Sequence, residues 1–434
     1  MSPEINIWND LQSIEQDQLL ERPALRDNAT VIADVRVIID SVRDKGDEAL
    51  RELTLQFDNA DIASARVTQD EFAAALAQLN EEAIAAIDLA IANVRCFHAE
   101  QMPRPIAVET MPGVHCARVS HPLDSVGLYV PAGTAPLPSA AIMLAVPAVI
   151  AACPTRVLCT PPRKDGSADP AVLVAASRAG VTEIFKVGGA QAIAAMAYGT
   201  ATIPKVRKIF GPGNAWVTCA KSLVSADSAG AAIDMPAGPS EVLVIADDGA
   251  SAEFVAADLL SQAEHGVDSQ VVLLTSSMRL AQQVQAQIDL QLDSLTRADI
   301  AREALRSSRL IVVDSVARAI DISNRYAPEH LILQVHNARA LLPQIRNAGS
   351  VFVGPWTPES VGDYCSGTNH VLPTYGFANT YSGLGVDQFL RQMTVQELSK
   401  DGLLGLADAV ITLANLEGLD AHAAAVRRRL EAST

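Results

Sequence analysis

The residues best suited to metal chemistry lie in the segment Ser261-Gln262-Ala263-Glu264-His265-Gly266. The segment ends a run of helix-like apolar spacing, and Gly266 marks its terminus. Gln262 and His265 are three positions apart, so on a helix their side chains can converge on one point. Taken alone, a Gln and a His near a helix end are more often capping or solvated groups, and an amide oxygen is an uncommon zinc ligand.

An acid and an imidazole stand side by side further along the chain, in Ala327-Pro328-Glu329-His330. Neighbours in an extended strand point to opposite sides, so a turn at Pro328 is needed for both side chains to reach one cleft. There the His can act as a general base, and the Glu can position or deprotonate water. The competing interpretation is a surface Glu beside a half-buried His.

Two more residues extend the candidate ligand set. Asp363 lies in a glycine-punctuated loop, and His422 lies in the C-terminal tail. With Gln262 and His265 they give four nitrogen and oxygen donors, which suits Zn²⁺ and also Mn²⁺ or Co²⁺. Spacing in the sequence does not prove that the four converge.

The elements that must position these residues form two series of alternating strands and helices, which predicts parallel sheets with crossover helices. The predicted strands are 126–130, 156–160, 183–187, 208–210, 241–246, 270–275, 310–313, 331–335 and 350–353. The predicted helices between them are 171–179, 191–197, 215–224, the helix ending at Gly266, helices spanning 279–305, and 316–326 and 338–346. A cleft between two such units is a natural active site. A helix is also predicted from Thr68 towards His98, and the last segment, 402–432, which carries the basic run Arg427–Arg429, is predicted to be helical after the loop-rich region 355–385.

Two strands of the first series end in glycine turns, Gly188-Gly189 and Gly211-Pro212-Gly213-Asn214, and each turn leads into a helix. In parallel sheets ligands bind beyond the carboxyl ends of the strands, and helix N-termini suit a pyrophosphate. The sequence contains no G-x-G-x-x-G, so glycines that serve only as tight turns are an equally good interpretation.

Composition excludes several classes of protein. The 434 residues carry a net charge of -17, which disfavours nucleic acids and anionic membranes as partners. Six cysteines without a C-x-x-C pair indicate a reduced, cytoplasmic chain, and the N-terminus has no secretory signal pattern. The charge-free run 125–155 contains four internal prolines and Gly133, which favours a loop of residues 131–136 followed by a buried helix over a membrane span.

Together these segments resemble the histidinol dehydrogenase family, from about residue 120 to 422. The matching motifs are Gly127-Leu128-Tyr129, Val187–Gln191, Gly211–Asn214, Asp234–Glu241, Ser261–Gly266, Ala327–Leu331, Gly362–Tyr364, Asn369–Thr374 and Glu417–His422. So many ordered motifs make coincidence implausible. The resemblance implies oxidation of L-histidinol through L-histidinaldehyde to L-histidine with two NAD⁺, the last step of histidine biosynthesis.

The resemblance also implies roles for individual residues. The matched zinc ligands are Gln262, His265, Asp363 and His422. The matched catalytic residues are His330 as principal base and Glu329 as the group that activates water. The matched NAD contacts are Tyr129, Gln191 and Asn214, and the matched substrate contacts are Ser240, His370 and Glu417, beside the zinc ligands and His330.

Family membership would further imply a homodimer in which the C-terminal segment reaches the neighbouring active site, so that Glu417 and His422 act in trans. One zinc ion per subunit would bind the imidazole and amino nitrogens of the substrate. The implied fold is α/β, with two Rossmann-like parallel-sheet domains like those of aldehyde dehydrogenases and with helical extensions at both ends. The expected regions are 1–125, helical and partly packed with the second α/β unit; 126–238, binding NAD; 239–375, carrying metal and catalytic residues; and 376–434, a helical tail reaching the partner subunit.

Three alternatives stay open. A related zinc- and NAD-dependent enzyme could act on another polar alcohol. An aldehyde dehydrogenase-like enzyme could use Cys219 or Cys365 as a nucleophile. A non-catalytic metal- or nucleotide-binding module is the third, and the intact Glu329-His330 pair argues against it.

Overall fold

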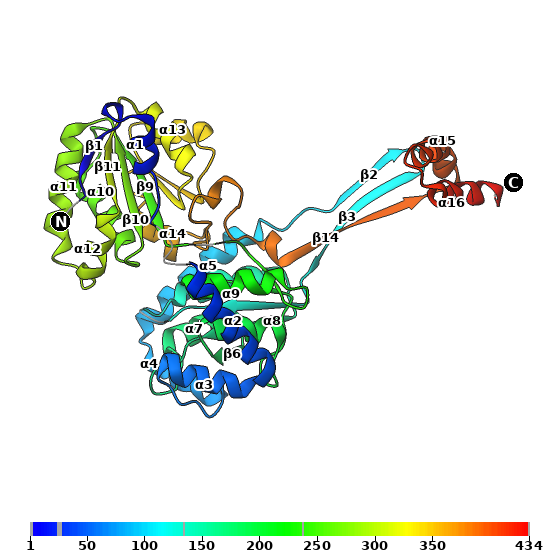
Figure 1. The fold of residues 1–434 in the computed structure, drawn as a ribbon, viewed down its shortest axis with the longest axis horizontal. Helices are drawn as coiled ribbons and strands as arrows, with labels where there is room; N and C mark the ends of the chain where they lie inside the picture. Colours follow the sequence, from blue (N-terminus) through cyan, green and yellow to red (C-terminus); the bar gives the residue numbers. More distant parts are fainter. Residues whose placement is uncertain (1–2, 24–27, 133–134, 237, 433–434) are drawn as a thin grey trace. The chain divides into compact units, whose positions relative to one another are not determined.

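The computed structural model describes residues 3–23, 28–132, 135–236 and 238–432, and its elements are labelled in Figure 1. Gly133 and Thr134 of the predicted loop, and Ala237 of the Asp234–Glu241 motif, lie outside the described residues. Contacts divide the chain into unit 1, which comprises Met1–Gln101 and Leu123–Phe389, and unit 2, which comprises Met102–Pro122 and Leu390–Thr434.

The first sheet of unit 1 is parallel, with the strand order β6-β5-β4-β7-β8. Its strands are β4 (Ser125–Tyr129), β5 (Thr155–Thr160), β6 (Glu183–Lys186), β7 (Lys208–Phe210) and β8 (Ala232–Ile233). The chain begins at the central strand β4, adds β5 and β6 on one side, and then adds β7 and β8 on the other. The order therefore reverses between β4 and β7, which is the topology of a Rossmann-like half, with a crevice at the carboxyl ends of those two strands.

Helices cover this first sheet because their apolar residues face it. On one face α2 (Asn28–Lys45), α8 (Gly189–Tyr198) and α9 (Ala215–Ala226) bury a common core with the strands. Elsewhere α6 (Pro138–Ile150) packs on β4, with α5 (Glu81–Ala99) and α7 (Pro170–Arg178) against it. Every residue of α6 from Ser139 to Ala148 is buried, as expected for a buried helix. Within the described ranges, no helix is long and apolar enough to cross a membrane.

The second sheet of unit 1 is also parallel, with the order β1-β11-β10-β9-β12-β13. Its strands are β1 (Ile5–Ile7), β9 (Glu241–Ala246), β10 (Gln270–Thr275), β11 (Arg309–Val312), β12 (His330–Gln334) and β13 (Ser350–Val353). Without β1, the order repeats that of the first sheet, with β9 as the central strand. The predicted α/β class with two Rossmann-like parallel sheets is therefore confirmed.

Helices also pack on both faces of the second sheet (Figure 1). One face carries α10 (Ala252–Ala263), α11 (Met278–Leu292) and α12 (Ala298–Arg306). The other carries α13 (Val316–Tyr326), whose buried side chains include Ile320 and Tyr326. The buried strands read as continuous apolar runs because both faces are covered.

Four local predictions are corrected by the structure. The predicted helix 338–346 is a 3₁₀ helix, Ala338–Gln344, which contains Pro343, a residue without an amide proton. The predicted helix from Thr68 to His98 is two helices, α4 (Gln69–Gln78) and α5, because Asn80 caps a new start. The N-terminal region, expected to be helical, supplies edge strand β1, and the region 355–385, expected to be loop, contains α14 (Glu359–Tyr364).

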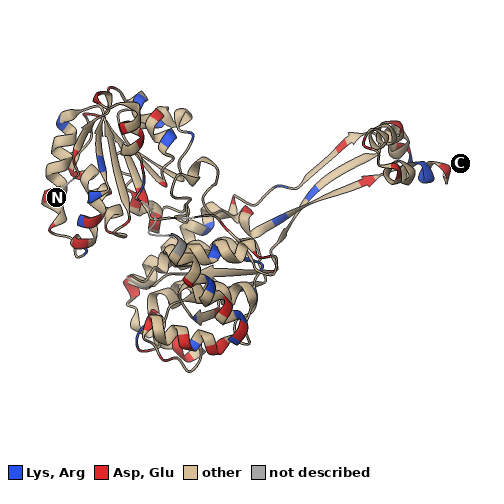
Figure 2. Ribbon diagram, viewed as in Figure 1, with Lys and Arg blue, Asp and Glu red and all other residues tan. Residues whose placement is uncertain are grey.

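Unit 2 consists of an antiparallel sheet and two helices. The sheet order is β14-β3-β2, with β2 (Ile106–Met111), β3 (Val114–Pro122) and β14 (Leu390–Leu398). The helices are α15 (Lys400–Leu416) and α16 (Asp420–Glu431), and the basic run Arg427–Arg429 lies in the last turns of α16, as predicted (Figure 2). Many large apolar side chains of unit 2 stay exposed: Ile106, Val108, Met111, Met393, Val395, Leu398, Leu404, Val410, Leu413, Leu416 and Leu419.

Candidate active site

The centre of the site is the Glu329-His330 pair at the amino end of β12. Ala327 adopts the left-handed conformation, with φ of 52°, so the backbone turns one residue before Pro328, where the sequence placed the turn. Both side chains are buried, with 6% exposure for Glu329 and 4% for His330. They reach the same place, since Glu329 Oε2 lies 3.6 Å from His330 Nδ1.

The backbone of Glu241, the first residue of β9, holds both members of this pair. Its amide donates to Glu329 Oε2 over 2.9 Å, and its carbonyl oxygen lies 3.1 Å from His330 Nδ1. A carbonyl can only accept, so Nδ1 carries a proton. Among the described residues, the buried His330 Nε2 has no hydrogen-bond partner, which makes it the ring atom free to take up or release a proton.

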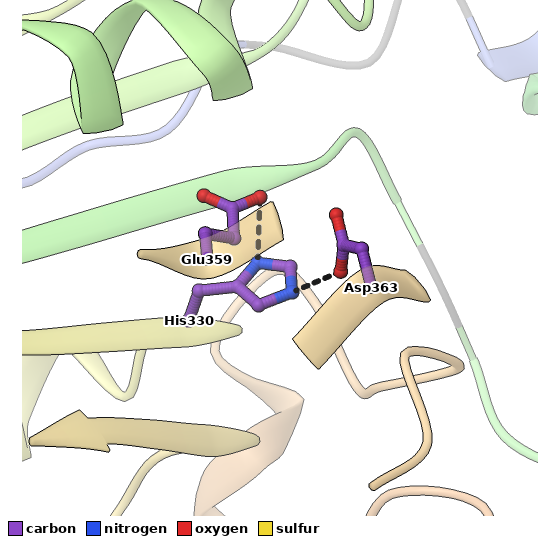
Figure 3. Close-up of side chains that lie close together, drawn as sticks. All are labelled: His330, Glu359 and Asp363. Carbon is purple, nitrogen blue, oxygen red and sulfur yellow. Dashed lines mark ion pairs between the residues drawn. The ribbon is translucent and has the colours of Figure 1, made fainter. Parts of the chain in front are cut away.

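Helix α14 brings two carboxylates to the same imidazole, as Figure 3 shows. Glu359 and Asp363 are one helical turn apart and therefore share a face. Glu359 Oε1 lies 3.7 Å from His330 Nδ1, and Asp363 Oδ1 lies 3.6 Å from Nε2. Ligand atoms of all three residues lie within 4.8 Å of one another, a spacing that could hold a metal ion.

Gln262 reaches this cluster from the last turn of α10, with 1% exposure. With its amide nitrogen toward Glu359, it donates to both carboxylate oxygens of Glu359, at 3.0 Å for Oε2. His265 lies beyond the end of α10 and is exposed, with Nδ1 3.0 Å from the carbonyl oxygen of Ser261. The prediction that Gln262 and His265 both lie on the helix is therefore wrong, because α10 ends at Ala263.

Burial and neighbouring charges set the ionisation of the site. Burial raises the pKa of Glu329 to about 8, although His330 opposes the shift. Burial also opposes ionisation of Asp363, yet the positive charge of His330, whose Nε2 lies 3.6 Å away, together with His370 and His265, holds the pKa of Asp363 below its usual value. The pKa of His330 lies well above its ordinary value because Glu359, Glu329 and Asp363 outweigh burial.

The remaining predicted substrate residues fall in both units. Ser240 directly precedes β9 and is half-buried. His370 is half-buried beside Asp363, with Nδ1 2.9 Å from the carbonyl oxygen of Asp363. Glu417 follows the end of α15 and His422 lies in the first turn of α16, and both are exposed on unit 2.

The predicted cofactor residues gather at the carboxyl edge of the first sheet. Tyr129 ends β4, and its hydroxyl accepts from the amide of Gly189 over 3.0 Å. Gln191 lies in the first turn of α8 and is buried, whereas Asn214 caps α9 by accepting from the amides of Trp216 and Val217. These residues follow β4, β6 and β7, so they surround the point where the strand order reverses.

A buried ion pair supports the glycine turn at that point. Asp234 accepts from the amide of Gly211 over 2.8 Å, and Lys221 donates to the carbonyl oxygen of Gly211 over 2.8 Å. The two side chains also pair with each other. Both polar groups of the Gly211 backbone are thus held in place beside the crevice.

Sequence reasoning missed two residues that shape the site. Glu359 stands four positions before Asp363, a signal that has meaning only once a helix is expected there. Arg22 pairs with the buried carboxylate of Glu241 over 2.7 Å and lies over the ring of Tyr326. No pattern around Arg22 in the sequence indicates this contact.

Comparison with known proteins gives one consistent family. A family model described as histidinol dehydrogenase matches residues 21–430. Curated histidinol dehydrogenases of Vibrio vulnificus (strain YJ016) and Vibrio cholerae are 55% and 56% identical over 428 and 425 residues, which cover 99% and 98% of this chain and 98% of each of those proteins. The crystal structure of a histidinol dehydrogenase from Elizabethkingia anophelis, 46% identical, superposes with a TM-score of 0.94 over 100% of this chain and 98% of that one. The chain belongs to the histidinol dehydrogenase family.

Proposed function

We propose that the chain oxidises L-histidinol through L-histidinaldehyde to L-histidine, with reduction of two NAD⁺, as the last step of histidine biosynthesis. The observation that carries this proposal is the buried Glu329-His330 pair. The main-chain amide and carbonyl of Glu241 hold the two side chains in place. The curated relatives that carry the name histidinol dehydrogenase support the choice of substrate.

The two residues act on different protons. In the first oxidation, His330 in its neutral form accepts the hydroxyl proton at Nε2 while the carbinol carbon loses a hydride. In the second, Glu329 in its carboxylate form removes a proton from the water that adds to the aldehyde. The hydrate then loses a hydride from its carbon and a hydroxyl proton to a base, which gives the carboxylic acid. A pKa of about 8 suits Glu329 to the hydration step, because the base is strong enough to deprotonate water in the transition state and is ionised at mildly alkaline pH.

Bound NAD⁺ supplies the hydride acceptor in both oxidations. Tyr129, Gln191 and Asn214 would hold it at the reversal point of the first sheet. The N-terminus of α8, whose N-cap is Gly188, suits its pyrophosphate.

The donor set fits one divalent ion, which we assign as Zn²⁺. Asp363, Gln262 and His265 would supply oxygen and nitrogen ligands, and His422 would complete the set. The bound ion would orient the substrate through its imidazole and amino nitrogens rather than generate hydroxide. In the competing set of His330, Glu359 and Asp363, a metal on His330 Nε2 would occupy the atom that must accept the substrate proton.

The active form would be a homodimer. Unit 2 leaves a large set of apolar side chains exposed on its sheet and helices. Apolar surface of this kind is typical of protein–protein interaction sites. A second copy of the chain would cover these side chains, and Glu417 and His422 would then enter the partner's site with Ser240 and His370 as substrate contacts. All six cysteines are free thiols, which suits a cytoplasmic enzyme.

The alternatives predict other behaviour. A cysteine nucleophile is disfavoured at Cys219, since burial raises the pKa of its thiol. A related enzyme for another polar alcohol would turn over amino alcohols that lack an imidazole.

The test is product identification by mass spectrometry, with purified metal-loaded protein, NAD⁺, and L-histidinol beside amino alcohols without the ring. L-histidine from histidinol alone supports the proposal. Equal turnover of the other alcohols would instead establish the alternative, and no product from any of them would exclude both.

A further inference from the structure

Glu359 is a buried carboxylate to which the proposed reaction gives no role. It has 1% exposure and contacts two residues that the reaction does use. One of its oxygens faces His330 Nδ1 at 3.7 Å, and both of its oxygens face the Gln262 side chain and accept from its amide once the nitrogen is turned toward α14. Asp363 lies one turn further along α14, so Glu359 is the neighbour of this candidate ligand on the same helix (Figure 3).

Gln262 has a difficulty that His265 and Asp363 do not share. An amide side chain offers an oxygen that can ligate a metal ion and a nitrogen that cannot, and the two exchange places by a half-turn about one bond. A ligand of this kind needs a neighbour that accepts from the nitrogen and repels the oxygen. An ionised carboxylate meets both needs, because it only accepts. Burial raises the pKa of Glu359, and the positive charge of His330 opposes that shift and so favours the ionised form.

We propose that Glu359 is a positioning residue that fixes the amide of Gln262, turning Oε1 away from α14 and presenting it as the metal ligand. This inference rests on the proposed function in that Gln262 must ligate the metal. Partners behind the ligand commonly act in this way in metal sites, and removing one usually weakens metal binding about 10- to 100-fold.

A second carboxylate on α10 separates this role from simple packing. Asp258, one turn before Gln262, accepts from the Gln334 amide over 2.7 Å, and Gln334 is the last residue of β12. This bond already ties α10 to the strand that carries His330. Glu359 is therefore left to set the orientation of the amide, and Asp258 provides a matched control for loss of a buried carboxylate.

The experiment measures the Zn²⁺ dissociation constant of the full-length protein by competition with a chromophoric chelator, in five proteins: wild type, E359Q, Q262E, Q262E/E359Q and D258N. Melting temperatures of the metal-free proteins check that each one folds. In E359Q two amides face each other and neither orientation is selected, so binding weakens about 10- to 100-fold. In Q262E two carboxylates face each other, and adding E359Q removes that conflict, so it should tighten binding.

The proposal thus requires that E359Q raise the Zn²⁺ dissociation constant in the wild-type background and lower it in the Q262E background. It also requires that D258N leave the dissociation constant within about threefold of wild type. If Glu359 acted only through its charge, E359Q would weaken binding in both backgrounds, and that result would overturn the proposal. Unchanged affinity in E359Q would overturn it as well. Two further variants, Q262A and D363A, separate the claim of a metal site from the claim about Glu359. If neither variant weakens Zn²⁺ binding, the proposed metal site is wrong. If both weaken binding and E359Q does not, only the role of Glu359 is overturned.

Discussion

The imidazole of His330 lies 3.1 Å from the carbonyl oxygen of Glu241 through Nδ1, and this contact decides which ring nitrogen does chemistry. The proton sits on Nδ1, and Nε2 is left as the exchanging atom. The same residue donates its amide to Glu329, so the first residue of β9 places base and water activator together. Arg22, through its pair with Glu241, anchors that point of the backbone.

Replacing His330 by Asn should remove the base and leave a side chain of similar polarity. We expect kcat for histidinol oxidation to fall about 10²- to 10⁴-fold, the usual contribution of a general base. The measurement is steady-state NADH formation at saturating substrate. His336→Asn, an exposed histidine just beyond the same strand, is the control and should keep wild-type turnover. A loss in both variants would show a structural effect instead.

The raised pKa of Glu329 predicts a pH dependence of histidinaldehyde oxidation. A carboxyl with a pKa of about 8 becomes the active carboxylate as pH rises, so the rate should climb roughly tenfold from one unit below that pKa and then level off. The charges that face it are His330, which lowers its pKa, and Glu241 and Asp363, which raise it. The profile is read from kcat with the aldehyde as substrate. Glu329→Gln should lose most of the rate and also the rise of the rate with pH. If the rise persists in this variant, another group titrates there.

Much of the fold was predictable because its signals are local. Buried parallel strands read as apolar runs, and strands such as Lys208–Phe210 and Ser350–Val353 were predicted to the residue. Strand β1 was not predicted because its three residues are too few to show a hydrophobic periodicity. Helix α14 was not predicted because it is a single short stretch between glycine-rich turns.

The candidate site was also predicted only in part. Glu329, His330 and Asp363 were found from residue type and family motif, and the structure brings them together. The roles of Glu359 and Arg22 depend on contacts across more than 90 and 200 positions, to Gln262 and Glu241 respectively. Residue type alone does not reveal such pairs, since surface Glu and Arg are far more common.

Asn214 should matter both as a helix cap and as a cofactor contact. Asn214→Ala removes the acceptor for two amides at the start of α9, which costs about 0.5 to 2 kcal/mol of stability. We also expect the KM for NAD⁺ to rise with little change in the KM for histidinol. Asn80→Ala removes a comparable cap on α5 and is the matched control. If both variants change KM alike, Asn214 acts only through the helix.

Whether unit 2 supplies residues to the active site of the partner subunit can be tested by mixing two inactive variants. Glu329→Gln damages the site on unit 1, and His422→Ala damages the site through unit 2. In a hybrid dimer with exchange between subunits, one of the two sites is assembled from undamaged parts, so random mixing should restore about a quarter of wild-type activity. The assay is turnover after the variants are co-expressed. If both residues act within one chain, mixing restores nothing.

The central claim is a four-electron oxidation on one metal-dependent site, and the most direct measurement is the NADH formed per L-histidinol consumed, with histidinol limiting. The account predicts two NADH per histidinol, with turnover lost on chelation of the metal and recovered when Zn²⁺ is returned. One NADH per histidinol, with aldehyde accumulating, would contradict the second role given to Glu329. Full turnover in thoroughly chelated protein would contradict the metal site.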